Sequence, residues 1–168
     1  MASAFVRDHV FQNLLEHELF QDNLCKAVED AYVETDGQYM DVDSAALQDD
    51  GCTAITAVLL DKRLVVAHVG DSRGVLAQGD TTVVLTDDHK PNRKDERSRI
   101  ENAGGQVVWA GTWRVSGVLA VSRSFGNRQM KQVGGLGAMG RARVVAGWGR
   151  AGHGASVRRT GEMRVAVC

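Results

Sequence analysis

Asp71 is the residue whose position in this sequence most directly suggests chemistry. It follows the apolar run Leu64 to Val69 and one glycine, so a buried strand ends on a carboxylate. Burial of a carboxylate costs roughly several kcal/mol of free energy unless a cation or hydrogen-bond donors bind it. A metal ion is the sharpest candidate for that partner, and we therefore predict Asp71 as a metal ligand. The alternative is a carboxylate held by Arg73, Ser72 or backbone N–H groups.

Ser72 offers a second kind of chemistry. Gly70, Ser72 and Gly74 fit the pattern G-x-S-x-G, which carries the nucleophile of serine hydrolases. That nucleophile needs a strand, a tight turn and then a helix. Here Val75 to Ala77 predicts another strand instead. A serine hydrolase that uses Ser72 is therefore kept only as an alternative, which labelling with a fluorophosphonate would reveal.

Four aspartates crowd one short polar stretch: Asp41, Asp43, Asp49 and Asp50. An EF-hand calcium loop that starts at Asp41 would need Gly at its sixth position and Glu at its twelfth. The sequence has Ala46 and Cys52 there. We interpret the stretch as a solvated acidic loop.

Apolar spacing predicts the elements that position these residues. Residues 3–19 and the segment that follows Asp22, a candidate N-cap, have the three-to-four-residue repeat of amphipathic helices. Asp36 and Gly37 are predicted to end the second helix. A third helix is predicted at residues 95–103, with Gly104 and Gly105 as its C-terminal stop.

Between and after these helices the pattern is typical of strands. The predicted strands cover residues 53–60, 64–69, 73–77, 81–85, 106–109 and 113–121, and the short turns between the first four favour antiparallel pairing. Residues 64–69 are apolar on both alternating sets, so both faces of that strand should be covered. His68, within it, is interpreted as a core histidine.

Composition excludes several classes of protein. The chain has 168 residues, enough for one ordinary domain, and a formal net charge of -1. Three scattered cysteines, Cys25, Cys52 and Cys168, are too few for a disulfide framework or a zinc pair. No apolar run approaches the roughly 18 residues of a membrane span, and no secretory signal is visible. We expect a soluble protein of the cytoplasm or nucleus that does not bind membranes.

Several motifs occur in an order that resembles a known family. They are Asp50-Gly-Cys-Thr-Ala54, His68-Val-Gly-Asp-Ser-Arg-Gly-Val-Leu76, Asp88-His-Lys-Pro91, Glu96 to Gly105, and Arg114 to Gly126. In these motifs the chain resembles the metal-dependent Ser/Thr phosphatases of type 2C, the plant members above all. The resemblance covers about residues 3–132.

The resemblance implies a fold, a reaction and cofactors. The fold would be α+β, an antiparallel β-sandwich flanked by helices, with residues 88–117 including a flap beside the active site. The reaction would be hydrolysis of phosphoserine and phosphothreonine in proteins by a water that two Mg or Mn ions activate. Asp71 corresponds to a ligand of a third, weaker metal site, and Ser122 and Arg123 lie in a motif that supports the core.

Other motifs of the family do not occur in this sequence. The N-terminal acidic pair, the Asp-Gly-His-Gly-Gly loop, the later Ser-Asp-Gly-Leu-Trp-Asp and the final Asp-Asn are all missing. We therefore expect an incomplete fold, truncated at both ends, with little activity and no catalytic residue that carries over. A non-catalytic fragment that binds the partners of phosphatases is the alternative.

Residues 133–168 differ from the rest of the chain. They carry one acidic residue and six arginines, whereas residues 1–132 carry 20 acidic and 14 basic residues. Nine of the 19 glycines lie there, without a stable helical or strand period. We predict two parts, residues 1–132 as the central part of a phosphatase domain and residues 133–168 as an unrelated, disordered tail. Without a recognition motif, no nucleic-acid partner is expected, and the folded part is expected to be a monomer.

Overall fold

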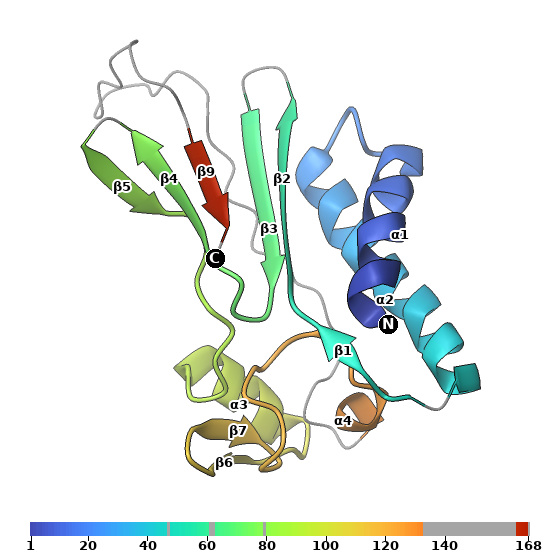
Figure 1. The fold of residues 1–168 in the computed structure, drawn as a ribbon, viewed down its shortest axis with the longest axis vertical. Coiled ribbons are helices and arrows are strands. Elements are labelled where there is room, and N and C mark those ends of the chain that lie inside the picture. The colour runs from blue at the N-terminus through green and yellow to red at the C-terminus, as the bar shows by residue number, and fades with distance from the viewer. Residues whose placement is uncertain (47, 61–62, 79, 133–163, 168) are drawn as a thin grey trace.

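The computed structural model describes residues 1–46, 48–60, 63–78, 80–132 and 164–167 (Figure 1). Two helices, α1 (Ala2–Glu16) and α2 (Leu24–Ala46), lie side by side and cover one face of the strands β2 (Ala54–Leu60) and β3 (Arg63–Val69). The described helices include none that is both long and apolar enough to cross a membrane. The predicted mixture of helices and antiparallel strands is confirmed.

The second helix differs from its prediction at both ends. Its cap is Asn23 rather than Asp22, because Asn23 Oδ1 accepts a hydrogen bond of 3.2 Å from the backbone N–H of Lys26. The helix also continues through Gly37 to Ala46. Asp36, predicted to help end it, is buried and bound by the Lys131 ammonium at 2.5 and 2.6 Å.

The predicted acidic loop is also wrong in part. Asp41 and Asp43 belong to α2, and Asp43 is fully buried. Asp43 Oδ1 accepts the backbone N–H of Asp49 at 2.8 Å, and its other oxygen lies 3.5 Å from Arg128 Nε. Asp49 Oδ1 also accepts the backbone N–H of Gln129 at 2.9 Å. Asp43 and Asp49 thus hold the C-terminal end of α2 against the short helix α4 (Arg128–Gln132), whereas Asp41 is exposed, as predicted.

Strand β3 is covered on both faces, as its apolar pattern predicts. Val65, Ala67 and Val69 join the cluster beneath the two helices. Leu64 and Val66 pack on the other side against Leu85 and the partly buried Ile55 and Leu76. Leu76 lies in a second sheet of order β5-β4-β9, made by β4 (Gly74–Gln78), β5 (Thr81–Val84) and β9 (Arg164–Val167). The two sheets therefore share a core, as in a sandwich.

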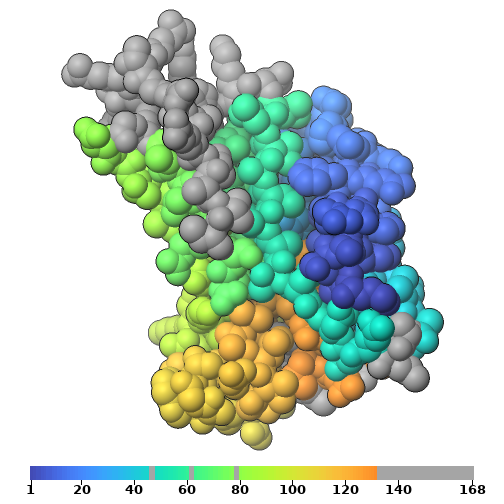
Figure 2. All heavy atoms as spheres, viewed as in Figure 1, coloured from blue at the N-terminus to red at the C-terminus, as the bar shows by residue number. Residues whose placement is uncertain are grey.

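The segment after β5 forms a smaller unit at one end of the molecule (Figures 1 and 2). It contains α3 (Lys94–Asn102), β6 (Val107–Trp109) and β7 (Trp113–Val115), packed around Ile100, Val107 and Val115. The helix ends at the predicted glycines, where Gly104 has a φ of 85°. We call residues 94–115 the flap unit.

The strand predicted for residues 113–121 is shorter than expected. It ends at Val115 because Ser116 and Gly117 have φ values of 50° and 74°, which turn the chain. The chain then returns to the sheets through β8 (Phe125–Gly126), which pairs with β1 (Gly51–Cys52). Of the predicted tail, residues 164–167 form β9 and the remainder lies outside the described residues, so its disorder stays a prediction.

Candidate functional site

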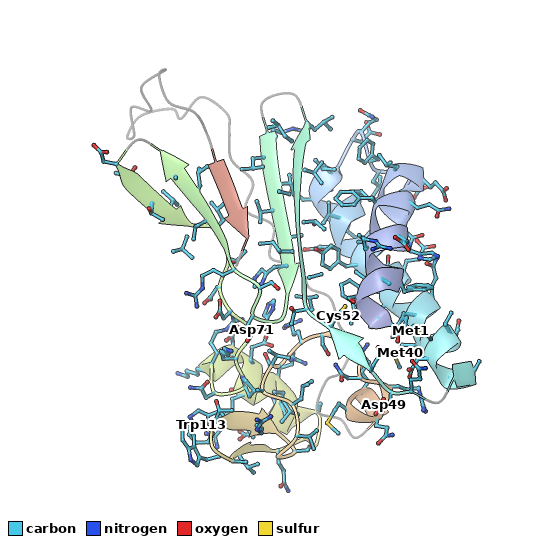
Figure 3. All side chains as sticks on the ribbon, viewed as in Figure 1. Met1, Met40, Asp49, Cys52, Asp71 and Trp113 are labelled. Atoms are coloured by element: carbon cyan, nitrogen blue, oxygen red, sulfur yellow. The ribbon has the colours of Figure 1, made fainter. Side chains whose placement is uncertain are left out.

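Asp71 lies at the end of β3, between the sheets and the flap unit (Figure 3). The turn that places it depends on Gly70, which has a φ of 86°. A Cβ atom on Gly70 would lie 2.2 Å from Thr53 Cγ2. Even alanine at position 70 would therefore collide with Thr53, the residue that precedes β2. The glycine is therefore required by its backbone conformation and also by the close approach of Thr53.

Two ion pairs tie this turn to the segment that precedes the flap unit. Lys90 Nζ lies 2.5 Å from Asp71 Oδ2. Arg73 donates from Nε and Nη2 to the two oxygens of Asp88, at 3.0 and 2.7 Å. Each segment thus contributes one acid and one base, two residues apart. The Arg73 guanidinium also lowers the pKa of the Asp88 carboxyl.

His89 links the same two segments through its backbone and its ring. Its N–H donates to the carbonyl of Gly70 at 2.9 Å, and the Gly70 N–H donates to His89 Nδ1 at 3.1 Å. The ring is buried and stacks on His68, with centroids 4.4 Å apart. Burial first, then the neighbouring His68 and Arg123, lower the pKa of His89 to about 3. Its ring is thus a neutral acceptor, and His68 is the core histidine that its strand position predicts.

An open cleft of about 520 Å³ adjoins the ion pairs. Basic side chains on its wall come from Arg73, Lys90 and Arg93, and acidic ones from Asp87 and Asp88. The Arg93 guanidinium donates to the backbone carbonyls of residues 87 and 88 and to the Asp95 carboxylate. The cleft is therefore lined by acidic and basic side chains, and the ion pairs between them fix their positions.

Glu96 anchors the flap unit, and the sequence patterns did not single out its role. Its carboxylate is 1% exposed and accepts hydrogen bonds from Arg123, Arg99 and Ser122. Burial would raise its pKa, but these donors reverse the effect and lower the pKa to about 2. Ser122 and Arg123 therefore have the structural role that was expected of them. Glu96 and Arg99 lie three residues apart, and this spacing was visible in the sequence. Arg123 lies 27 residues after Glu96, and no local pattern identified it as a partner of that carboxylate.

The described residues do not fit a centre of two divalent cations. Mg²⁺ and Mn²⁺ prefer several oxygen ligands. Within the described part of the chain, no group of three or more His, Cys, Asp or Glu side chains could hold a metal ion. Asp71 supplies one partly exposed carboxylate that is paired with Lys90. Asp49, another acid of the sequence, lies away from it beside α4 (Figure 3).

Ser72 is not placed as the nucleophile of a serine hydrolase. Its hydroxyl shares a hydrogen bond of 2.9 Å with Thr53 Oγ1. The residues that follow form β4, an extended strand, where the nucleophile of that class would be followed by a helix. The strand predicted at this point is confirmed, and the geometry gives the hydrolase alternative no support.

Comparison with known proteins agrees with the fold and with the motifs. The family model described as Protein phosphatase 2C matches residues 1–147. The rice protein named "Probable protein phosphatase 2C 52" is 52% identical over 131 residues, which are 78% of this chain and 27% of that protein. The Arabidopsis protein named "Probable protein phosphatase 2C 69" is 51% identical over 131 residues, 78% of this chain and 37% of that protein.

Solved structures show the same architecture. A serine-threonine phosphatase 2C from Toxoplasma gondii has a TM-score of 0.74 and 25% identity, and the similarity covers 86% of this chain and 59% of that chain. A sex determining protein of C. elegans, 24% identical, has the same fold with a TM-score of 0.77, over 86% of this chain and 36% of that chain. This chain thus spans well under half of the two curated plant relatives. The chain belongs to the protein phosphatase 2C family.

Proposed function

We propose that this chain is the central part of a metal-dependent protein Ser/Thr phosphatase and that residues 1–168 alone have little activity. Membership of the family supports the reaction, which is hydrolysis of phosphoserine and phosphothreonine in phosphorylated proteins. The low activity is inferred from one observation: among the described residues, Asp71 has no acidic neighbours that would complete a metal-binding group.

The cofactors that we propose are Mg or Mn. Such ions, when bound, would supply a water of lowered pKa and would stabilise the oxygens of the displaced phosphate. Within this chain, Asp71 is the residue that we propose as a ligand to a divalent cation. The principal ligands would have to come from protein segments that are not among the described residues. We further propose that the protein acts in the cytoplasm or nucleus.

The chain's own contribution is then to position the turn and the flap. Gly70 and His89 fix the backbone around Asp71 through their two mutual hydrogen bonds. Glu96 fixes the flap unit beside that turn through Arg123. These contacts would hold one wall of a phosphopeptide site, whereas they include no group that could activate water. The proposal that such a fragment binds partners of phosphatases without catalysis remains the alternative.

Two enzyme assays test the proposal with a phosphothreonine peptide and Mn²⁺. Purified residues 1–168 are expected to hydrolyse the peptide at the background rate, whereas the full-length rice relative should turn it over. A chimera in which residues 1–132 replace the matching part of that relative should regain Mn²⁺-dependent hydrolysis. An inactive but folded chimera would contradict the phosphatase proposal. Turnover by residues 1–168 comparable to that of the relative would contradict the argument from missing ligands.

Asp71 is tested in the same chimera. Asp71→Asn should raise the Mn²⁺ concentration needed for half-maximal hydrolysis, because the amide carries no charge for the cation. Asp95→Asn is the matched control, since Asp95 is exposed and binds Arg93 at the start of α3. An equal effect of the two changes would show that Asp71 is not a metal ligand.

A further inference from the structure

The end of the chain returns to the second sheet as a strand. Strand β9 pairs with β4 in antiparallel orientation, with Ala166 opposite Val75. It lies on the side of β4 that faces away from β5 (Figure 1). We propose that this edge of β4 is a binding site for an extended peptide segment and that residues 164–167 occupy the site as a tethered, displaceable strand.

Strand β9 belongs to a part of the chain that is separable from the phosphatase fold. The family model matches residues 1–147, and β9 lies beyond them. Among the described elements, β4 is the main neighbour of β9. The strand is therefore attached to the fold chiefly through one sheet edge. Such an attachment resembles the way a peptide binds a protein by adding a strand to its sheet.

The edge of β4 needs a cover. The strand has the sequence Gly74-Val-Leu-Ala-Gln78, without a charged residue or a proline. Charged residues and prolines are the features that keep an exposed edge from pairing with another chain, and β4 has neither. A segment that pairs with β4 satisfies backbone groups that would otherwise be open to any extended strand. Residues 164–167 supply that segment within the same molecule.

Net charge favours the tail as the occupant of this edge. Residues 133–168 contain six arginines and one acidic residue, whereas residues 1–132 contain 20 acidic and 14 basic residues. A basic segment is attracted to an acidic protein surface, and salt weakens the attraction. The tail is thus complementary in charge to the part of the chain that it contacts.

The register shows which backbone groups of β4 face the site. The N–H of Leu85 donates to the carbonyl of Gly74 at 2.9 Å, so the carbonyl of Gly74 faces the side of β5. In an antiparallel ladder, successive residues direct their backbone groups to opposite sides of the strand. The N–H and carbonyl groups of Val75 and Ala77 therefore face β9.

The same register separates two neighbouring residues of β9. Ala166 lies opposite Val75, so these two residues form a hydrogen-bonded pair of the ladder. Val165 lies opposite Leu76, and its N–H faces away from β4. Loss of the N–H of Ala166 should therefore weaken the pairing, whereas loss of the N–H of Val165 should not.

Covalent attachment favours β9 over a free peptide of the same sequence. A tethered segment has an effective concentration on the order of 1 mM at its site. If the free peptide binds the open edge with a Kd of about 0.1 mM, β9 would occupy about nine-tenths of the sites. The intact chain would then bind the free peptide about tenfold more weakly than a chain with an open edge.

The first experiment measures the fluorescence anisotropy of a labelled peptide with the sequence of residues 160–167, added to the full chain. Ala166→Pro in the protein should open the edge and tighten binding of the peptide about tenfold. Val165→Pro is the matched control, because an edge strand tolerates proline where the N–H faces away from its neighbour. This variant should bind the peptide as weakly as the parent. Circular dichroism verifies that both variants are folded.

The peptide provides the reciprocal test. A methyl group on the backbone nitrogen of Ala166 in the peptide should abolish binding to the Ala166→Pro protein. The same modification at Val165 should leave binding unchanged, because that nitrogen faces away from β4.

Amide hydrogen exchange gives a readout that needs no peptide. In the Ala166→Pro protein, the N–H groups of Val75 and Ala77 should exchange faster than in the parent, since both face the opened edge. The N–H of Leu76, which faces β5, should exchange at the rate of the parent.

Three results would overturn the inference. The first is equal binding of the peptide to the parent and to both proline variants, because the peptide would then bind elsewhere, such as at the outer edge of β5. The second is absence of binding to the Ala166→Pro protein up to about 1 mM peptide. The third is undiminished binding of the peptide that is methylated at Ala166. None of these measurements uses a phosphopeptide, so their failure is distinct from failure of the proposed function.

Discussion

The guanidinium of Arg123 binds the carboxylate of Glu96 side-on, with Nη2 2.6 Å from Oε1 and Nε 2.9 Å from Oε2. Glu96 lies on α3, in the flap unit, and Arg123 lies on the segment that returns to the sheets. Their side chains are 1% and 10% exposed. The flap unit is therefore joined to the rest of the fold by a buried ion pair. Loss of one member would leave the other charge buried without its partner.

Glu96→Gln should lower the free energy of unfolding by about 3 to 5 kcal/mol, the cost of breaking a buried pair by removing one charge. Urea denaturation of purified residues 1–168 measures the change. Glu101→Gln is the control on the same helix, because Glu101 pairs with Arg97 at 2.7 Å on an exposed surface. That control should cost about 0.5 kcal/mol or less. Equal losses in the two variants would show that Glu96 is no more important than a surface acid.

Stability should fall with acid in two successive pH ranges. His89 has a folded pKa of about 3, below its ordinary value of 6.5, so the unfolded chain takes up a proton first. Its contribution is complete above pH 6.5 and is lost as the pH falls towards 3. Glu96 has a folded pKa of about 2, so its contribution is complete above pH 4.5 and is lost below that. Between pH 6.5 and 4.5 the loss should be about 2 to 3 kcal/mol, mainly from His89.

Urea denaturation at a series of pH values measures this slope. His89→Asn keeps an acceptor near the Gly70 N–H but removes the titrating ring. The variant should be less stable at pH 7 and should lose much less stability between pH 6.5 and 4.5. An unchanged slope would show that His89 takes up its proton in the folded state as readily as in the unfolded state.

Local patterns predicted the elements, whereas the contacts between them depended on the fold. The strand 64–69 and its covered faces followed from apolar alternation, and the stop at Gly104 followed from its residue type. Asp36 and Gly37 were predicted to end α2 because both are weak helix formers. That prediction failed because Lys131, 95 residues later, binds Asp36. Short-range sequence patterns cannot predict a partner that lies so far away along the chain.

The candidate site shows the same division. Asp71 was placed at the end of a buried strand from the sequence alone, and the structure has it there. The cation that pairs with Asp71 is Lys90, which the sequence analysis did not propose as a partner. Arg73, which it did propose, binds Asp88 instead. Both lysine and arginine could reach an acid at this turn. The hydrogen bonds of His89 with Gly70 set the register of the two segments and therefore the pairing.

Gly70→Ala should destabilise the protein more than Gly104→Ala, although the two glycines have φ values of 86° and 85°. A left-handed backbone costs a residue with a Cβ atom about 1 to 2 kcal/mol. At Gly104 nothing lies within 4 Å of the added atom, so this cost is the whole effect. At Gly70 the collision with Thr53 should add about 1 to 3 kcal/mol. Thermal unfolding of both variants measures the difference, and equal effects would show that Thr53 moves aside freely.

Gly37→Ala should stabilise the protein. Gly37 lies inside α2, away from both ends, and an added Cβ would meet nothing within 4 Å. Alanine in a helix interior is favoured over glycine by about 0.5 to 1 kcal/mol, mainly because the unfolded chain loses freedom. The midpoint of urea unfolding should therefore rise, with the slope unchanged. Asp36 and Lys131 should remain paired, since the change leaves their side chains in place. A fall in the midpoint would mean that α2 needs the backbone flexibility of glycine at position 37, next to the Asp36 that binds Lys131 of α4.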